Sequence, residues 1–126
     1  MSGPPPSQQE IIQKYKQLQS DCTQFVTKIS ELEVERNEHD LVIKTLAPLE
    51  GDRKAFRLVG GVLVERTVGE VLPSVTENRV NLNTVLENLT KMLDEKQKIT
   101  LAYKNEHNIR TQEEAQQDAK AQQMAA

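Results

Sequence analysis

The chain has 126 residues, of which 37% are hydrophobic, 28% are charged and 3% are aromatic, with no tryptophan. This length allows at most one domain, and the shortage of bulky side chains argues against a large core or an enzyme pocket. The formal net charge of −3 argues against nucleic-acid binding, which normally needs a basic face.

The single cysteine, Cys22, excludes an intrachain disulfide and a cysteine-rich zinc site. No apolar run approaches the ~20 residues of a membrane-spanning helix, and no signal-peptide pattern is found. We therefore expect a soluble, cytosolic chain with no catalytic residue, no cofactor and no metal. An additional nuclear location stays open.

The first predicted element is a long helix. Residues 1–7, which contain the run MSGPPP, are expected to form a flexible tail, and Ser7 to Glu10 (SQQE) have the Ser-x-x-Glu pattern of a capping box that starts a helix. Beyond it, residues recur at alternating intervals of four and three, which predicts a coiled coil. The predicted seam consists of Ile11, Tyr15, Leu18, Cys22, Phe25, Ile29, Leu32, Arg36, His39, Ile43 and Leu46. The helix should end before Pro48, and Gly51 indicates a turn.

A β-hairpin is predicted at about residues 53–67, centred on Gly60 and Gly61, which tolerate the positive φ of a two-residue turn. This turn pairs Val59 with Val62, Leu58 with Leu63, and Phe56 with Glu65. One face then carries Phe56, Leu58 and Leu63, and the other carries Val59, Val62 and Val64. Burial of six such side chains contributes about 1.5 to 3 kcal/mol each, which a lone two-stranded hairpin cannot gain. The hairpin is therefore expected to need other chains.

The second long helix has two possible starts. Thr67 to Glu70 (TVGE) and Ser74 to Glu77 (SVTE) both resemble capping boxes, and we favour the earlier start with a bend at Pro73. The predicted seam reads Val71, Val75, Asn78, Leu82, Val85, Leu89, Met92, Lys96, Ile99 and Tyr103.

The two seams predict that the helices lie antiparallel against each other. Laying the second helix back along the first pairs Arg36 with Asn78, so that the polar interruptions meet. The same register places Lys96 opposite Leu18 and Tyr15 opposite Ile99. The expected fold is therefore mainly α, a long antiparallel two-helix coiled coil (residues 8–110) with one hairpin at the connection. Residues 111–126, rich in Gln, Ala and Glu, are expected to be a flexible polar tail.

Three strings in this arrangement resemble the prefoldin family, specifically its β-class subunits. They are ELEVERNEHDLVIKTL (residues 31–46), RLVGGVLVERTVGEVLP (residues 57–73) and EHNIR (residues 106–110). The resemblance implies a heterohexameric chaperone of two α-class and four β-class subunits. Its hairpins would form a double β-barrel platform, and the tips of its coiled coils would hold unfolded clients, notably nascent actin and tubulin. The clients would pass to the cytosolic group II chaperonin without ATP.

The resemblance also assigns candidate sites. The hairpin residues Phe56, Leu58, Val59, Gly60, Gly61, Val62, Leu63 and Val64 would be subunit contacts. Candidate client contacts at the tips are Ile11, Ile12, Tyr15, Leu18, Ile99, Leu101, Tyr103 and Ile109. Ile12 and Leu101 lie off the predicted seam and are the best candidates for exposure, whereas Ile11, Tyr15, Ile99 and Tyr103 could instead close the seam.

Other functions remain open from the residues. A structural tether or a dimeric zipper would also use long heptad helices, although it has no need for six apolar strand residues. A transcription-factor zipper lacks the basic region that should precede the heptads. Cys22 is interpreted as a packing residue and His39 as a hydrogen-bonded interface residue, and no nucleophile, base and orienter set indicates an enzyme.

Overall fold

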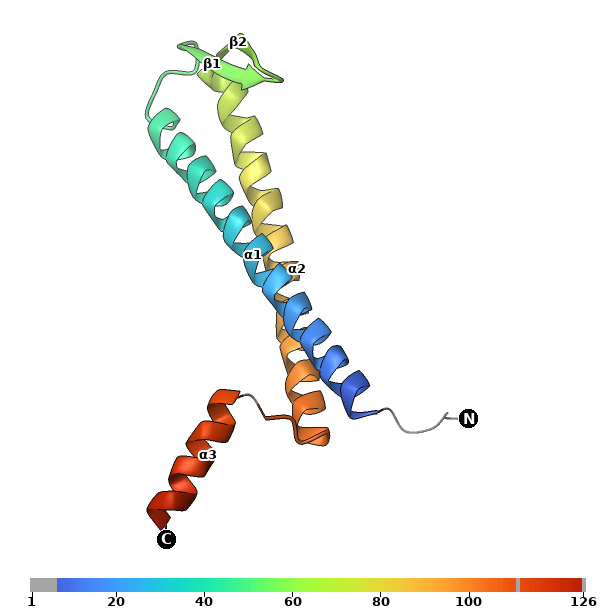
Figure 1. Ribbon diagram of the computed structural model, residues 1–126. Helices are drawn as coiled ribbons and strands as arrows, with labels where there is room; N and C mark the ends of the chain where they lie inside the picture. The colour runs from blue at the N-terminus through green and yellow to red at the C-terminus, as the bar shows by residue number, and fades with distance from the viewer. Residues whose placement is uncertain (1–6, 111, 126) are drawn as a thin grey trace. The chain divides into compact units, whose positions relative to one another are not determined.

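The computed structural model describes residues 7–110 and 112–125. Two long antiparallel helices, α1 (Gln8–Leu46) and α2 (Val68–Glu106), are joined by a hairpin of β1 (Lys54–Val59) and β2 (Val62–Thr67), and α3 (Gln112–Ala125) follows (Figure 1). The predicted fold class is confirmed. The expected N-terminal tail lies outside the described residues, except for Ser7.

The chain divides into two compact units. We call Phe25–Met92 the hairpin unit, because it contains both strands. Met1–Gln24 together with Leu93–Ala126 form the terminal unit, which brings together the first half of α1 and the second half of α2.

Both predicted helix starts are confirmed. The N–H of Glu10 donates to Ser7 Oγ at 3.2 Å at the start of α1, and the N–H of Glu70 donates to Thr67 Oγ1 at 3.3 Å at the start of α2. Pro73 is therefore inside α2 rather than before it, while the bend expected there stays a prediction.

The loop before the hairpin completes the cap of α2. The N–H of Val68 donates to the carbonyl of Arg53 and the N–H of Gly69 donates to the carbonyl of Gly51, each at 2.9 Å. A Cβ on Gly69 would lie 3.2 Å from the Gly51 oxygen, so this close approach favours glycine. The first amides of α2, which have no partner within the helix, are satisfied in this way.

The hairpin has the predicted register. Val59 pairs with Val62, Leu58 with Leu63 and Phe56 with Glu65 in an antiparallel ladder. Gly60 and Gly61 have φ values of 54° and 81°, as a two-residue turn with two left-handed positions requires.

The seam of α1 is confirmed in full, because all eleven predicted residues are buried or half-buried. The seam of α2 is confirmed as far as Leu82 and is then partly wrong. Val85, Met92 and Ile99 are 45%, 49% and 55% exposed, and their neighbours Leu86, Leu93 and Thr100 are turned inward instead. In a strict heptad repeat the intervals between seam residues alternate between four and three. Here Leu82 follows Asn78 by four residues and Leu86 follows Leu82 by four again, and two successive intervals of four locally unwind a coiled coil.

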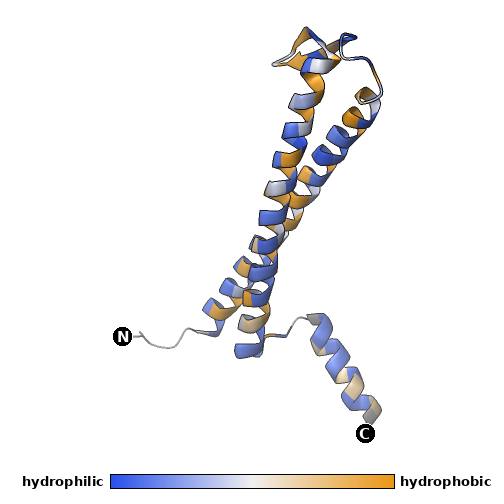
Figure 2. Ribbon diagram, turned by 180° about the vertical axis from the view of Figure 1, so that it is seen from behind, coloured by the Kyte–Doolittle hydropathy of each residue, from blue (hydrophilic) through white to orange (hydrophobic). Residues whose placement is uncertain are grey.

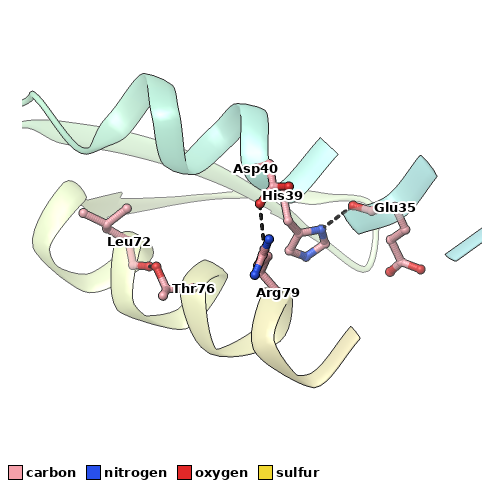
Figure 3. A network of polar contacts seen from close by, with 6 residues as sticks. All are labelled: Glu35, His39, Asp40, Leu72, Thr76 and Arg79. Carbon is pink, nitrogen blue, oxygen red and sulfur yellow. Dashed lines mark hydrogen bonds and ion pairs between the residues drawn. The ribbon is translucent and has the colours of Figure 1, made fainter. Parts of the chain in front are cut away.

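The predicted register between the helices is also wrong, because the side-chain contacts join residues that it holds apart. Arg79 forms an ion pair with Asp40 at 2.8 Å, beside His39, whose Nδ1 lies 2.8 Å from the Glu35 carbonyl (Figure 3). In the terminal unit Lys96 pairs with Asp21 at 3.5 Å instead of facing Leu18. Charged pairs beside the seam favour this register over the expected one, because each supplies a partner for a half-buried charge.

Helix α2 ends in a Schellman motif. Asn108 has φ of 52°, the N–H of Ile109 donates to the Lys104 carbonyl at 2.9 Å, and the N–H of Asn108 donates to the Asn105 carbonyl at 3.3 Å. The segment expected to be a flexible tail then forms α3, whose Ala, Gln and Glu residues have high helix propensity. Its side chains are mostly exposed, and mobility of the segment stays a prediction.

Candidate functional site

The hairpin exposes apolar side chains on both of its faces. Phe56, Leu58, Val59, Val62 and Leu63 are between 54% and 70% exposed, and Val64 is half-buried. Because residues two apart share a face, each face carries at least two of them. Figure 2, coloured by hydropathy, shows apolar segments along these strands. The hairpin residues predicted from the sequence therefore lie together and are accessible.

A groove of about 580 Å³ lies beside β1 in the hairpin unit. Its apolar lining comes from Leu41, Val42 and Leu46 of α1, Phe56 and Leu58 of β1, and Val71 and Val75 of α2. Sequence reasoning missed the contribution of α1, because Leu41 and Val42 lie off the seam and single apolar residues on a helix surface are common.

The candidate client contacts fall into three groups by exposure, all within the terminal unit. Tyr15 and Leu18 are buried in the seam, which for Tyr15 agrees with the alternative interpretation that it closes the seam. Ile11, Tyr103 and Ile109 are half-buried. Ile12, Ile99 and Leu101 are 43%, 55% and 57% exposed and are the apolar side chains that a client could reach.

Polar side chains make several of the contacts between α1 and α2 in the terminal unit. Cys22 Sγ lies 3.6 Å from Thr100 Oγ1, and Lys96 reaches Asp21. Lys14 Nζ lies 5.1 Å from the centre of the Tyr103 ring, and the His107 ring lies against that ring with centroids 4.3 Å apart and planes tilted by 51°. In this part of α2, Lys96 and Thr100 therefore face inward while Ile99 and Leu101 face outward. The packing role expected for Cys22 agrees with its half-buried position.

Within residues 7–110 and 112–125, no three His, Cys, Asp or Glu side chains are grouped so that they could hold a metal ion. None of the helices that the structure describes is both long enough and apolar enough to cross a bilayer.

Comparison with known proteins identifies the family. The model of the family described as "Prefoldin subunit" matches residues 9–114. The chain is 41% identical to human prefoldin subunit 2 over 113 residues, which cover 90% of this chain and 73% of the relative. It is 40% identical over 106 residues to prefoldin subunit 2 of Arabidopsis thaliana, covering 84% and 72%. A probable prefoldin subunit 2 of Dictyostelium discoideum is 47% identical over 92 residues, covering 73% and 79%.

The fold is also that of a solved structure. The crystal structure of the prefoldin beta subunit from Thermococcus strain KS-1 superimposes with a TM-score of 0.72, covering 85% of this chain and 94% of that chain at 17% identity. Helix, hairpin and helix thus follow one another as in a β-class subunit. The chain therefore belongs to the prefoldin family, as a β-class subunit of the subunit 2 type, a non-catalytic chaperone subunit.

Proposed function

We propose that this chain is one of the four β-class subunits of a cytosolic heterohexamer that also contains two α-class subunits. The complex captures unfolded nascent proteins, including actin and tubulin, at the ends of its coiled coils. It then delivers them to the group II chaperonin without ATP.

The observation that carries this proposal is the exposed apolar hairpin. Five of its side chains are more than half exposed, although burying each would contribute about 1.5 to 3 kcal/mol. A two-stranded sheet leaves both of its edges unpaired, and such edges pair readily with further strands. Neighbouring subunits that bring their own hairpins would cover both the side chains and the edges.

Client capture is supported by the exposed residues of the terminal unit. Ile12, Ile99 and Leu101 offer exposed apolar surface, and the non-directional contacts of such surface suit clients of many sequences. Each contact is weak, but several arms that bind one client at once raise the overall affinity.

The proposal is tested by changing Leu58 and Leu63 together to Asp. These residues face each other across the ladder, so two carboxylates in the sheet would prevent burial of this face. We expect the variant chain to remain helical by circular dichroism and to be absent from hexamers formed with co-expressed partner subunits. Val80→Asp, at an exposed position of α2, is the matched control and should assemble normally. Normal assembly of the Leu58 and Leu63 variant would contradict the proposal.

A further inference from the structure

The Ser-x-x-Glu pattern at Ser74 to Glu77 is not used as a helix cap, because α2 already begins at Val68. Instead, Ser74 Oγ accepts a hydrogen bond of 3.1 Å from Nη1 of Arg57, which comes from β1. We propose that Ser74 is a phosphorylation site, and that Arg57 and Arg66 hold its phosphate and so fix the hairpin to the start of α2. The modification goes beyond the proposed function, because its effect is defined on the free chain.

A pocket of about 190 Å³ lies beside Ser74 in the hairpin unit. Its lining consists of Arg57, Arg66, Glu70, Val71 and Ser74. The two arginines share one face of the hairpin, because Arg66 is two residues from Val64, the ladder partner of Arg57. The pocket is several times larger than the ~30 Å³ that one water molecule occupies in the liquid. A phosphate on Ser74 therefore fits there, between two guanidinium groups.

The charges in this pocket favour a phosphate. Within residues 7–110 and 112–125, no carboxylate lies within ion-pair distance of Arg57. Arg66 pairs with Glu70 at 3.6 Å, but both side chains are more than half exposed, so this pair is weak. A phosphate brings about −1.5 to −2 charges at pH 7 and three acceptor oxygens, two of which one guanidinium can bind at once. It therefore replaces a neutral partner of Arg57 and competes with Glu70 for Arg66.

The start of α2 can open to let a kinase reach Ser74, which is half-buried. Pro73 lies inside the helix and has no N–H, so the Gly69 carbonyl lacks the bond that residue 73 would supply. Leu72, as the residue before a proline, is also disfavoured in helical geometry. Few bonds therefore oppose local opening of this turn, and such opening exposes the hydroxyl.

The acidic residue three positions after Ser74 is the feature that an acid-directed protein kinase recognises by charge. The same spacing occurs at Ser7, Ser30, Thr67, Thr84 and Thr111. The pattern therefore does not select Ser74 by itself, and what distinguishes Ser74 is the guanidinium 3.1 Å from its hydroxyl.

The group transfer uses ATP as the phosphoryl donor and the kinase as catalyst. The bond between Ser74 Oγ and the γ-phosphorus forms, and the bond from that phosphorus to the bridging oxygen breaks, which releases ADP. The hydroxyl proton passes to the catalytic base of the kinase.

Two measurements test the proposal. In the first, the full chain is purified from its own cells with phosphatase inhibitors, and mass spectrometry maps its phosphorylated residues. In the second, the chain is prepared with phosphoserine at position 74, and hydrogen exchange of residues 54–67 is compared with that of the unmodified chain. The matched control has phosphoserine at position 30, because Ser30 is exposed on α1 of the same unit and also precedes a glutamate by three residues.

We expect phosphate on Ser74 in the chain from cells. In the second measurement, phosphoserine at position 74 should slow amide exchange in β1 and β2 about fivefold, which corresponds to about 1 kcal/mol. Phosphoserine at position 30 should leave this exchange unchanged. Arg57→Gln should remove most of the slowing, and high salt should reduce it, because the contact is between exposed charges.

Other results would overturn the inference. A chain from cells whose Ser74 peptide is detected without phosphate would exclude the site. Slowing that persists in the Arg57→Gln variant, or that phosphoserine at position 30 matches, would exclude the arginines as its receptor. Faster exchange of the hairpin would mean that the phosphate repels Glu70 and loosens the hairpin instead of fixing it.

Discussion

At the scale of single residues, Asn108 gives a structural role to EHNIR (residues 106–110), one of the three strings that resemble the prefoldin family. Its left-handed conformation ends α2, and it lets Ile109 bond back to Lys104. Apart from glycine, asparagine is one of the residues that adopt this conformation most readily. The sequence HNIR thus terminates a helix, a role that is independent of any client.

Replacement of Asn108 by Ala should lower the free energy of unfolding by about 1 kcal/mol, because alanine resists a positive φ. Asn108→Gly should be close to wild type, since glycine has no Cβ to resist it. Thermal unfolding of the isolated chain, followed by circular dichroism, distinguishes the two variants. Equal melting temperatures for Ala and Gly would show that the cap does not stabilise the chain.

At the scale of elements, α2 carries two apolar rows with the same heptad spacing. Val85, Met92 and Ile99 form one row, and Leu86, Leu93 and Thr100 form the adjacent row one residue on. The structure turns the second row inward, with Leu86 only 5% exposed. In the hairpin unit this choice buries Leu86, but in the terminal unit it half-buries Leu93 and Thr100 and leaves Ile99 outside.

This assignment of the seam predicts a specific cross-link to the single native cysteine. Thr100 Oγ1 lies 3.6 Å from Cys22 Sγ, so Thr100→Cys should form a disulfide with Cys22 under mild oxidation. Ile99→Cys, on the exposed row, should not. Non-reducing mass spectrometry after protease digestion gives the answer. Preferential cross-linking of Ile99→Cys would mean that the row predicted from the sequence is the true seam.

Some of these elements can be predicted from the sequence and others cannot. The caps at Ser7 and Thr67 and the Gly60 turn depend on residues within four positions of one another, so local patterns identify them. The seam of α1 has one apolar row and was predicted in full. In α2 the pattern allows two rows, and only the pairing with α1 selects one of them. The register depends on ion pairs such as Arg79 with Asp40, residues that the heptad pattern treats as solvent-exposed.

At the scale of the whole molecule, the apolar surface around the hairpin was predictable in part. The hairpin stands out because an apolar segment interrupts a polar chain, and its register follows from one turn. Leu41 and Val42 carry no such signal, because they join the groove only once the hairpin folds back beside α1. The segment that forms α3 was expected to be a flexible tail because its sequence has no apolar stripe to bury, although its residues favour helix.

Client holding should depend on the exposed apolar residues of the terminal unit. Changing Ile12 and Leu101 together to Ser should weaken suppression of client aggregation several-fold without affecting assembly, because both side chains are about half exposed. Val80→Ser, equally exposed but in the hairpin unit, is the control. Light scattering of a denatured client diluted into purified hexamer measures the effect. Unaltered suppression would remove Ile12 and Leu101 from the client surface.

The central claim is that this chain acts as a subunit of a hexamer, assembled through its hairpin. Native mass spectrometry of the full-length chain, purified under mild conditions from its own cells, tests it most directly. The account predicts a complex of six small subunits of different mass with one copy of this chain. A homodimer at twice the chain mass would contradict it and would favour a coiled-coil zipper instead.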